Sequence, residues 1–348
     1  MRYVFVKILK IWLIVGFLLS IIGCELDKPK VYAFSYVGTT MGTSFSIKSG
    51  YLPPEISIKQ LQELITTRLN EINQRMSTYI NDSELSKLNQ AQTTDNQKVS
   101  PELFKVLKTS EEISTLSRGA FDITIAPLVD LWGFGPDVSS LKAPPTKDIN
   151  ALLVRSGYQK LQLNTVSLTL KKLLPELSMD LSALAKGYAV DEVALILEQQ
   201  GIQDYLVEIG GELRLKGKNL QNKKWRIAIE KPNIQQRELQ KVIAISDIAM
   251  ATSGDYRNFF EQEGVRFSHT IDPRTGSPVT HKLASVTVLH SSSMYADAWA
   301  TAFMVLGSEQ AYKIAEQQKI AAFFIIKTEQ GFAERATPLF TDYIEVKS

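Results

Sequence analysis

The segment Met294–Phe303, which reads MYADAWATAF, predicts a buried helix that carries two polar side chains. Its alanines and aromatic residues are typical of a helix packed in a core. Asp297 and Thr301 lie one helical turn apart and therefore share a face. A carboxylate and a hydroxyl beside backbone carbonyls are oxygen ligands that Mg²⁺ accepts. The alternative is that Asp297 serves the helix amino terminus and Thr301 bonds back to the preceding turn.

A second segment, MDLSALAKGYAVDEV at 179–193, predicts the start of another helix, which we expect to span Asp180–Gln200 and to end at Gly201. Asp180, Ala183 and Lys186 step by three along one side of this start. Backbone donors at a helix start and the ammonium of Lys186 suit a diphosphate. The alternative is an ordinary amphipathic helix with a solvated lysine.

A third segment, His269–Gly276 (HTIDPRTG), is a turn that presents a histidine, an aspartate and an arginine together. Asp272 could equally cap the turn. The chain has three histidines, and its one cysteine is Cys24. A zinc site would therefore need carboxylates from distant segments, which disfavours transition-metal catalysis.

Aromatic residues in polar and glycine-containing loops form a fourth set, over 76–79, 119–124 and 131–135. Such rings can stack on a planar ligand, although in most proteins they are core edges. Gly210-Gly211 is predicted to join two strands as a hairpin turn. The glycines do not match a dinucleotide fingerprint, because a strand and not a helix follows them.

Apolar spacing elsewhere predicts an α+β fold with mixed, largely antiparallel sheets packed with helices. We expect a single catalytic domain over 34–348. The helices outside the segments above are expected over Pro54–Arg75, from the Ser100-Pro101 cap onward, and over Glu309–Gln318. The expected strands are Tyr205–Ile209, Glu212–Lys216, Trp225–Glu230, Val242–Ser246, Ala284–Leu289, Ala321–Ile326 and Leu339–Val346.

The first 23 residues predict a signal peptide, because basic residues precede an apolar run, Ile11–Ile22, that is too short to span a membrane. The run ends at Ile21-Ile22-Gly23-Cys24, which resembles the lipobox of bacterial lipoproteins with Cys24 as the lipidated residue. An uncleaved anchor is the alternative. Residues 24–33 then form a tether. We expect a lipoprotein of the bacterial cell envelope that faces the periplasm, on the inner membrane or, because Glu25 follows Cys24, on the outer one.

Composition limits the remaining function classes. The 348 residues are 44% hydrophobic, which is enough for a large core. The net charge is +2, from 39 basic and 37 acidic residues, and basic residues nowhere run beyond a pair. We therefore expect no nucleic-acid partner.

Taken in order, the motifs resemble the ApbE family of FAD:protein FMN transferases over nearly the whole chain after the tether. The segments that carry the resemblance are Thr39–Thr43, Met76–Tyr79, Gly119–Asp122, Met179–Asp191, Glu208–Glu212, His269–Gly276 and Ala296–Thr301.

The resemblance implies a role for each matching position. Mg²⁺ would be held by the side chains of Asp297 and Thr301 and by the carbonyls of Ala183 and Ala300. His269 matches a histidine placed beside the reacting diphosphate, so the implied catalytic residues are His269, Asp297 and Lys186. The positions that match the FAD site are Met41, Tyr79, Ala120, Phe121, Asp122, Asp180, Lys186 and Ile271.

The implied reaction is Mg²⁺-dependent transfer of FMN from FAD to a Thr or Ser hydroxyl of a target flavoprotein, with release of AMP. An FAD diphosphatase that yields FMN and AMP is one alternative, and a non-catalytic flavin-binding lipoprotein is another. The implied acceptors are subunits of sodium-translocating NADH:quinone reductases or Rnf-type complexes, modified at a site that resembles Asp-x-x-Ser/Thr-Gly-Ala-Ser/Thr. The general base is either His269 or Asp297.

Overall fold

The computed structural model describes residues 33–135, 142–232, 239–255 and 259–344. The predicted signal peptide, Cys24 and all of the tether except Ala33 lie outside these ranges. Within the described ranges, no helix is both long enough and apolar enough to cross a membrane.

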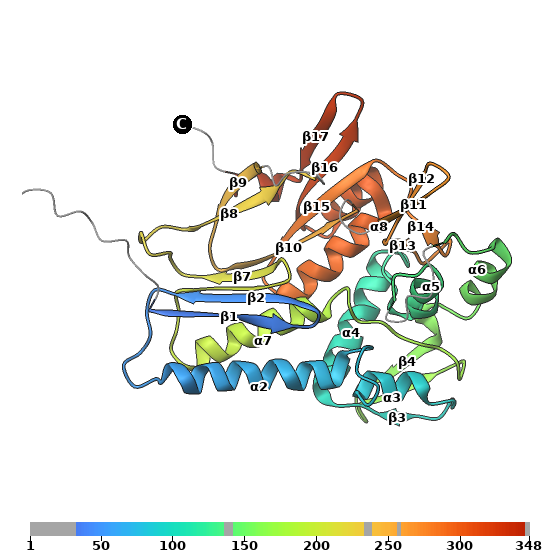
Figure 1. Ribbon diagram of the computed structural model, residues 1–348, viewed down its shortest axis with the longest axis horizontal. Coiled ribbons are helices and arrows are strands. Elements are labelled where there is room, and N and C mark those ends of the chain that lie inside the picture. Colours follow the sequence, from blue (N-terminus) through green and yellow to red (C-terminus); the bar gives the residue numbers. More distant parts are fainter. Residues whose placement is uncertain (1–32, 136–141, 233–238, 256–258, 345–348) are drawn as a thin grey trace, which may run out of the picture. The chain divides into compact units, whose positions relative to one another are not determined.

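An eight-stranded sheet in which every neighbouring pair is antiparallel forms the centre of the fold (Figure 1). Its strands, in spatial order, are β1 (Phe34–Thr40), β2 (Thr43–Ser49), β6 (Tyr205–Ile209), β7 (Glu212–Lys216), β10 (Ile248–Gly254), β15 (Leu283–His290), β16 (Ala321–Thr328) and β17 (Gly331–Ala336). The expected α+β class with largely antiparallel sheets is confirmed.

Smaller sheets flank the main one. They pair β3 (Gln97–Lys98) with β5 (Thr169–Lys172) and β4 (Leu161–Asn164), β8 (Trp225–Glu230) with β9 (Leu239–Ile245), β11 (Phe259–Gln262) with β12 (Val265–Ser268), and β13 (Ile271–Asp272) with β14 (Ser277–Pro278).

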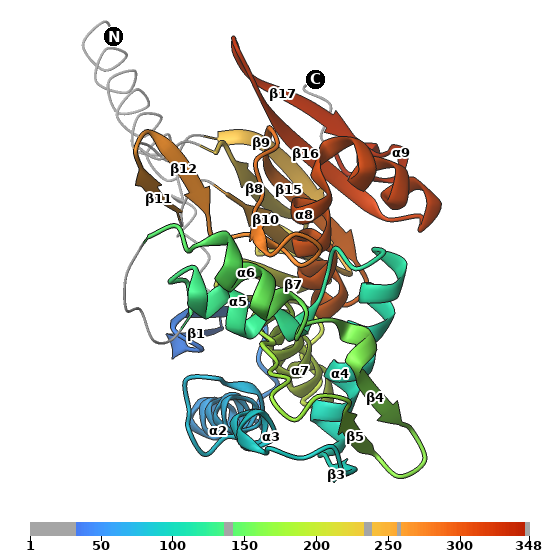
Figure 2. The same ribbon diagram turned by 90° about the vertical axis from the view of Figure 1, so that its right-hand side faces the viewer.

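Helices cover the main sheet, with α7 and α8 against the strands and α2 against α7 (Figures 1 and 2). The helices are α2 (Ile58–Met76), α3 (Glu84–Gln90), α4 (Pro101–Leu116), α5 (Ala126–Leu131), α6 (Thr146–Leu153), α7 (Ala185–Gln199), α8 (Ser293–Gln317) and α9 (Pro338–Thr341). Short 3₁₀ helices occupy Ile123–Ile125 and Tyr158–Lys160.

Two hydrophobic clusters stabilise these layers. The larger one joins the sheet to α2, α4, α7 and α8. The smaller one joins α5 and α6 to the β11–β13 region through Leu128, Trp132, Ile149, Phe260 and Ile271. The indole nitrogen of Trp132 donates to the Gly276 carbonyl at 2.8 Å, which ties this cluster to the β13–β14 turn.

The β6–β7 hairpin follows the prediction closely. Gly210 and Gly211 have φ values of 61° and 103°, a left-handed region that favours glycine. Ile209 is paired with Glu212 across the turn. Cross-strand partners share a face of the sheet, so Glu212 points into the core beside Ile209.

Several predicted boundaries were wrong. The helix expected from Asp180 begins at Ala185, and residues before it form turns. The helix expected from Pro54 begins at Ile58, after Ser57. The helices expected around Asp297 and over Glu309–Gln318 form one element, α8, that is broken at Gly307.

The strand expected over Leu339–Val346 is also wrong. Its first residues form the short helix α9, which has Pro338 in its first turn, and residues 345–348 lie outside the described ranges. Proline fixes φ and favours a helix start, and this outweighed the apolar spacing. The strand that pairs with β16 is β17, immediately before this helix.

The crossing of α7 and α8 depends on Gly187. A Cβ built on Gly187 would lie 2.3 Å from the backbone oxygen of Ser293 and 2.7 Å from the Cα of Met294. Both are backbone atoms, so a side chain could be accommodated only by moving one helix away from the other.

We expect Gly187→Ala to lower the free energy of unfolding by about 1–3 kcal/mol, because the added methyl group overpacks a backbone contact. Chemical denaturation measures the change. Gly50→Ala is the control, since its Cβ would meet only the side chain of Leu220, at 3.0 Å. Wild-type stability in Gly187→Ala would contradict the proposed close contact.

Candidate active site

One ammonium and two carboxylates from different elements meet at the helix crossing. Lys186 Nζ lies 3.6 Å from Asp297 Oδ2 and 3.6 Å from Glu212 Oε1. It also donates to the Ser182 carbonyl at 3.2 Å. The side chain of Lys186 is 26% exposed, whereas those of both carboxylates are nearly inaccessible. The lysine is therefore the member of the cluster that solvent or a ligand can reach.

Local structure explains why these three groups converge. Lys186 is in the first turn of α7, Asp297 is near the start of α8, and Glu212 is the first residue of β7 after the hairpin turn. The contact at Gly187 brings the two helix starts together, and the antiparallel hairpin brings β7 beneath them. The two starts also bring the positive ends of both helix dipoles to one place.

Asp297 is 5% exposed, and its Oδ2 accepts a hydrogen bond from the Gly187 amide at 3.1 Å. Burial raises the pKa of this carboxyl above its ordinary value, while Lys186 and the Gly187 amide oppose the shift. The structure does not show the alternative in which Asp297 serves the amino terminus of its own helix. Asp297 binds the start of the neighbouring helix, α7.

Glu212 is the site residue that was not predicted. It is 5% exposed, and its Oε2 has no hydrogen-bond partner. Burial raises the pKa of Glu212 to about 8, although the nearby Lys186 favours the ionised form. The signal in the sequence was its position, because the residue opposite the inward-facing Ile209 must also face inward.

The predicted Mg²⁺ ligands lie on two elements. Thr301 is half-buried one turn after Asp297 on α8, Ala300 is buried beside it, and Ala183 is half-buried in the turn before α7. Carboxylate, hydroxyl and carbonyl oxygens are a hard donor set that fits Mg²⁺. In the described parts of the chain, no group of three or more His, Cys, Asp or Glu residues could hold a metal. An Mg²⁺ site here would use one carboxylate, with a hydroxyl and backbone carbonyls as its other protein ligands.

The turn that precedes α7 is held by backbone contacts. The Asp180 amide donates to the Ile123 carbonyl at 2.7 Å, and Asp180 Oδ1 accepts from the Ser182 amide at 2.8 Å. The expectation that Asp180, Ala183 and Lys186 step along one helix face is wrong, because the helix begins after Ala183. The turn nevertheless joins the predicted segments 119–124 and 179–187.

The segment 119–124 contributes mainly backbone to this region. Ala120 is buried and the Phe121 ring is only 2% exposed, so the interpretation of Phe121 as a core residue is the correct one. Asp122 Oδ1 accepts from the amide and hydroxyl of Thr124, and Oδ2 accepts from the Tyr158 amide. Burial raises the pKa of Asp122, and these hydrogen bonds oppose that shift. Its carboxylate joins two loops.

Tyr79 and Met41 are in turns at the surface of the described domain. The Tyr79 side chain is 71% exposed, which leaves its ring accessible to a ligand. Burial of part of the side chain and the charges of Asp180 and Asp130 raise the pKa of Tyr79. Met41 lies in the β1–β2 turn at φ 51° and packs partly against the core.

Ile271 belongs to the smaller hydrophobic cluster, and His269 contacts Phe134, which packs against that cluster. The half-buried His269 meets the Phe134 ring edge-on, with centroids 6.3 Å apart, and Ile271 is buried. Asp272 binds the Arg274 guanidinium through both oxygens, at 2.8 and 2.7 Å, and accepts from the Arg274 amide. The alternative that Asp272 caps its own turn is therefore confirmed.

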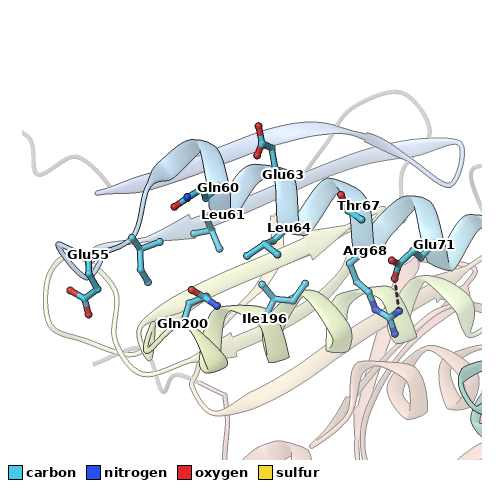
Figure 3. Close-up of a pocket in the computed structure, with 11 residues that line it drawn as sticks. Glu55, Gln60, Leu61, Glu63, Leu64, Thr67, Arg68, Glu71, Ile196 and Gln200 are labelled. Atoms are coloured by element: carbon cyan, nitrogen blue, oxygen red, sulfur yellow. Dashed lines mark hydrogen bonds and ion pairs between the residues drawn. The ribbon is translucent and has the colours of Figure 1, made fainter.

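A separate groove of about 600 Å³ opens between α2 and α7 (Figure 3). Glu55, Glu63 and Leu64 line it together with Ile196, and Arg68 and Glu71 form an ion pair at one end. None of the predicted site residues lines this groove. The groove is therefore separate from the cluster of Lys186, Asp297 and Glu212 at the α7–α8 crossing.

The sequence and the fold both match known proteins. The model of the ApbE family matches residues 41–324. The chain belongs to the ApbE family. A Vibrio cholerae relative named FAD:protein FMN transferase is 45% identical over 334 residues, covering 96% of this chain and 98% of the relative. A Haemophilus influenzae protein of the same name is 42% identical over 340 residues, covering 96% and 97%.

A solved member of the family supports the same assignment. The structure of the flavin transferase ApbE from Vibrio cholerae matches with a TM-score of 0.84 at 45% identity, covering 89% of this chain and 99% of that chain. The resemblance of the motifs to the ApbE family is confirmed over nearly the whole described domain.

The pKa of Glu212 predicts how stability depends on pH. A carboxyl whose folded pKa is raised from 4.5 to about 8 stabilises the fold fully below about pH 4.5, and this contribution is lost as pH rises through about 8. Glu212→Gln removes the titration. We expect its free energy of unfolding in EDTA to decrease less with pH than that of the wild type, with a limiting difference of about 1.4 kcal/mol per pH unit.

Denaturant unfolding at a series of pH values measures this difference. Glu208→Gln is the matched control, because Glu208 is in the same hairpin and its carboxylate accepts only from the Gly211 amide at 2.8 Å among the bonds described. Parallel pH profiles for wild type and Glu212→Gln would show that Glu212 titrates normally.

Proposed function

We propose that this protein is an FAD:protein FMN transferase that requires Mg²⁺ and attaches FMN to a Thr or Ser hydroxyl of another protein. The observation that carries the proposal is the pair formed by the accessible Lys186 and the buried Asp297, where two helix starts meet. Positive helix ends and an ammonium favour a diphosphate, and a carboxylate beside them favours a divalent cation. The names of the relatives identify FAD as the diphosphate and a protein as the acceptor.

The metal would be held by Asp297 and Thr301 through their side chains and by Ala183 and Ala300 through their carbonyls. These oxygen donors fit Mg²⁺ and offer nothing to a softer metal. When bound, Mg²⁺ would neutralise diphosphate charge and stabilise negative charge on the leaving AMP.

The protein's own residues orient the substrates. Lys186 gives the diphosphate a cationic contact, and Tyr79 offers its accessible ring to the flavin. The acceptor oxygen attacks the phosphorus nearer the riboflavin, so that an O–P bond to FMN forms while the P–O bond to AMP breaks. His269 takes or steers the proton of the hydroxyl, and the carboxylate of Asp297 is the alternative acceptor.

We also propose that the protein is a lipoprotein of the bacterial envelope, tethered through Cys24 and facing the periplasm. The basic and apolar amino-terminal sequence and the Ile-Ile-Gly-Cys ending support this location. Tethering raises the effective concentration of the enzyme near membrane acceptors. Subunits of sodium-translocating NADH:quinone reductases and Rnf-type complexes are the acceptors we propose.

The proposal is tested by incubating the mature protein with FAD, Mg²⁺ and a peptide that carries the Asp-x-x-Ser/Thr-Gly-Ala-Ser/Thr sequence. We expect mass spectrometry to show a gain of one FMN on the peptide, with AMP released in equal amount. Free FMN and AMP with unmodified peptide would instead indicate an FAD diphosphatase. Binding of FAD without either product would indicate a non-catalytic flavin carrier.

Asp297→Asn should reduce the rate of peptide modification about 100-fold or more, because the site loses a charge that favours the metal. Glu309→Gln is the control on the same helix, since its carboxylate is 75% exposed and pairs only with Arg335 among the ion pairs described. Full activity in Asp297→Asn would remove the metal assignment.

His269→Ala should reduce kcat for transfer by about 10²–10⁴-fold and change the Kd for FAD much less, because a proton acceptor acts in the transition state. Single-turnover transfer and flavin fluorescence titration measure the two quantities. Equal losses in both would place His269 in binding and not in proton transfer.

A further inference from the structure

We propose that Glu212 is a positioning residue that holds Lys186 and makes FAD binding conditional on the divalent cation. The proposal rests on the proposed function, since it concerns the diphosphate and the metal of the same site. Glu212 does not reach the surface, so it acts through Lys186 and through its charge and not by touching the substrate.

The lysine is shared between two equivalent partners. Lys186 Nζ lies 3.6 Å from Glu212 Oε1 and 3.6 Å from Asp297 Oδ2. A cation held by Asp297 would repel the ammonium, because two positive charges would share one carboxylate. Glu212 then remains as the buried partner that keeps Lys186 in place for the diphosphate.

The β6–β7 hairpin holds the lysine along its length. At Gly210, a Cβ would lie 3.2 Å from Lys186 Cδ and 2.8 Å from Thr43 Cγ2, so the hairpin backbone packs closely on the lysine stem. Glu212, two residues later, holds the ammonium. The position of Lys186 is therefore set by β7 as well as by its own helix.

The charges of the cluster give the conditional behaviour. When the pH exceeds the pKa of Glu212, about 8, and both carboxylates are ionised, their two negative charges exceed the single charge of Lys186, so the cluster attracts a cation and repels a diphosphate. A bound divalent cation reverses the sign and admits the diphosphate. The Oε2 of Glu212 has no hydrogen-bond partner, which adds to the cost of burying this carboxylate.

Removing the charge of Glu212 should affect the binding of Mg²⁺ and the binding of FAD differently. In Glu212→Gln we expect the Mg²⁺ concentration for half-maximal transfer to rise about tenfold. The Kd for FAD in EDTA should decrease, because one of the charges that repel the diphosphate is removed. The ratio of the FAD Kd in EDTA to that in Mg²⁺ should fall about tenfold. A purely structural role would weaken both ligands together.

The experiment is a flavin fluorescence titration of the mature protein with FAD, in EDTA and in saturating Mg²⁺, at about pH 9, above the pKa of Glu212 of about 8. Glu208→Gln removes a carboxylate from the same hairpin and should leave the ratio unchanged. Glu212→Asp keeps the charge, so most of the wild-type ratio should remain. If packing damage alone caused the effect, Glu212→Asp would lower the ratio as well.

Two results would overturn the proposal: an unchanged ratio in Glu212→Gln, or equal weakening of FAD binding with and without Mg²⁺. A wild type that binds FAD equally well in EDTA and Mg²⁺ would be a different failure. That result would contradict the metal assignment in the proposed function, and not only the role of Glu212.

Discussion

The contact between α7 and α8 at Gly187 is the constraint on which the site depends. Each helix start is bound by a carboxylate of the other helix. Asp297 of α8 accepts from the Gly187 amide, and Asp191 of α7 accepts from the amides of Ser293 and Met294. This reciprocal capping satisfies buried amides and places two positive helix ends side by side. The two helix starts are therefore joined by the packing itself, before any ligand is present.

The same packing creates a costly electrostatic arrangement. A half-buried lysine between two buried carboxylates is weak evidence for stability, because desolvation opposes the attraction between the charges. The unpartnered oxygen of Glu212 adds to that cost. Such local costs are expected at functional sites, where the surrounding structure holds groups in arrangements that they would not adopt alone. The hydrophobic core around the sheet, α7 and α8 supplies that support.

The sequence predicted the elements whose signals are local, and it failed where tertiary packing prevailed. The Gly210-Gly211 hairpin was correct because glycine tolerates positive φ, and the Ser100-Pro101 helix start was correct because cap chemistry is local. The turn over 180–184 was mistaken for helix, since its binding to the Ile123 carbonyl comes from a distant segment. Glu212 was missed because strand polarity alone does not show which of its faces is buried. No local sequence pattern predicted that α7 packs against α8.

The break at Gly307 explains how α8 can serve both the site and the sheet. Gly307 adopts φ 72°, and a Cβ there would lie 2.8 Å from the His281 ring. His281 Nε2 lies 2.8 Å from the Met304 carbonyl, which can only accept, while His281 Nδ1 accepts from the Leu283 amide. The His281 ring therefore provides a hydrogen-bond partner for a carbonyl near the break in the helix. The segment that carries Asp297 and Thr301 is thus a short helix held at its start by Asp191 and near its end by His281. Other elements hold both ends of this segment. The positions of Asp297 and Thr301 therefore do not depend on how the part of α8 after Gly307 packs on the sheet.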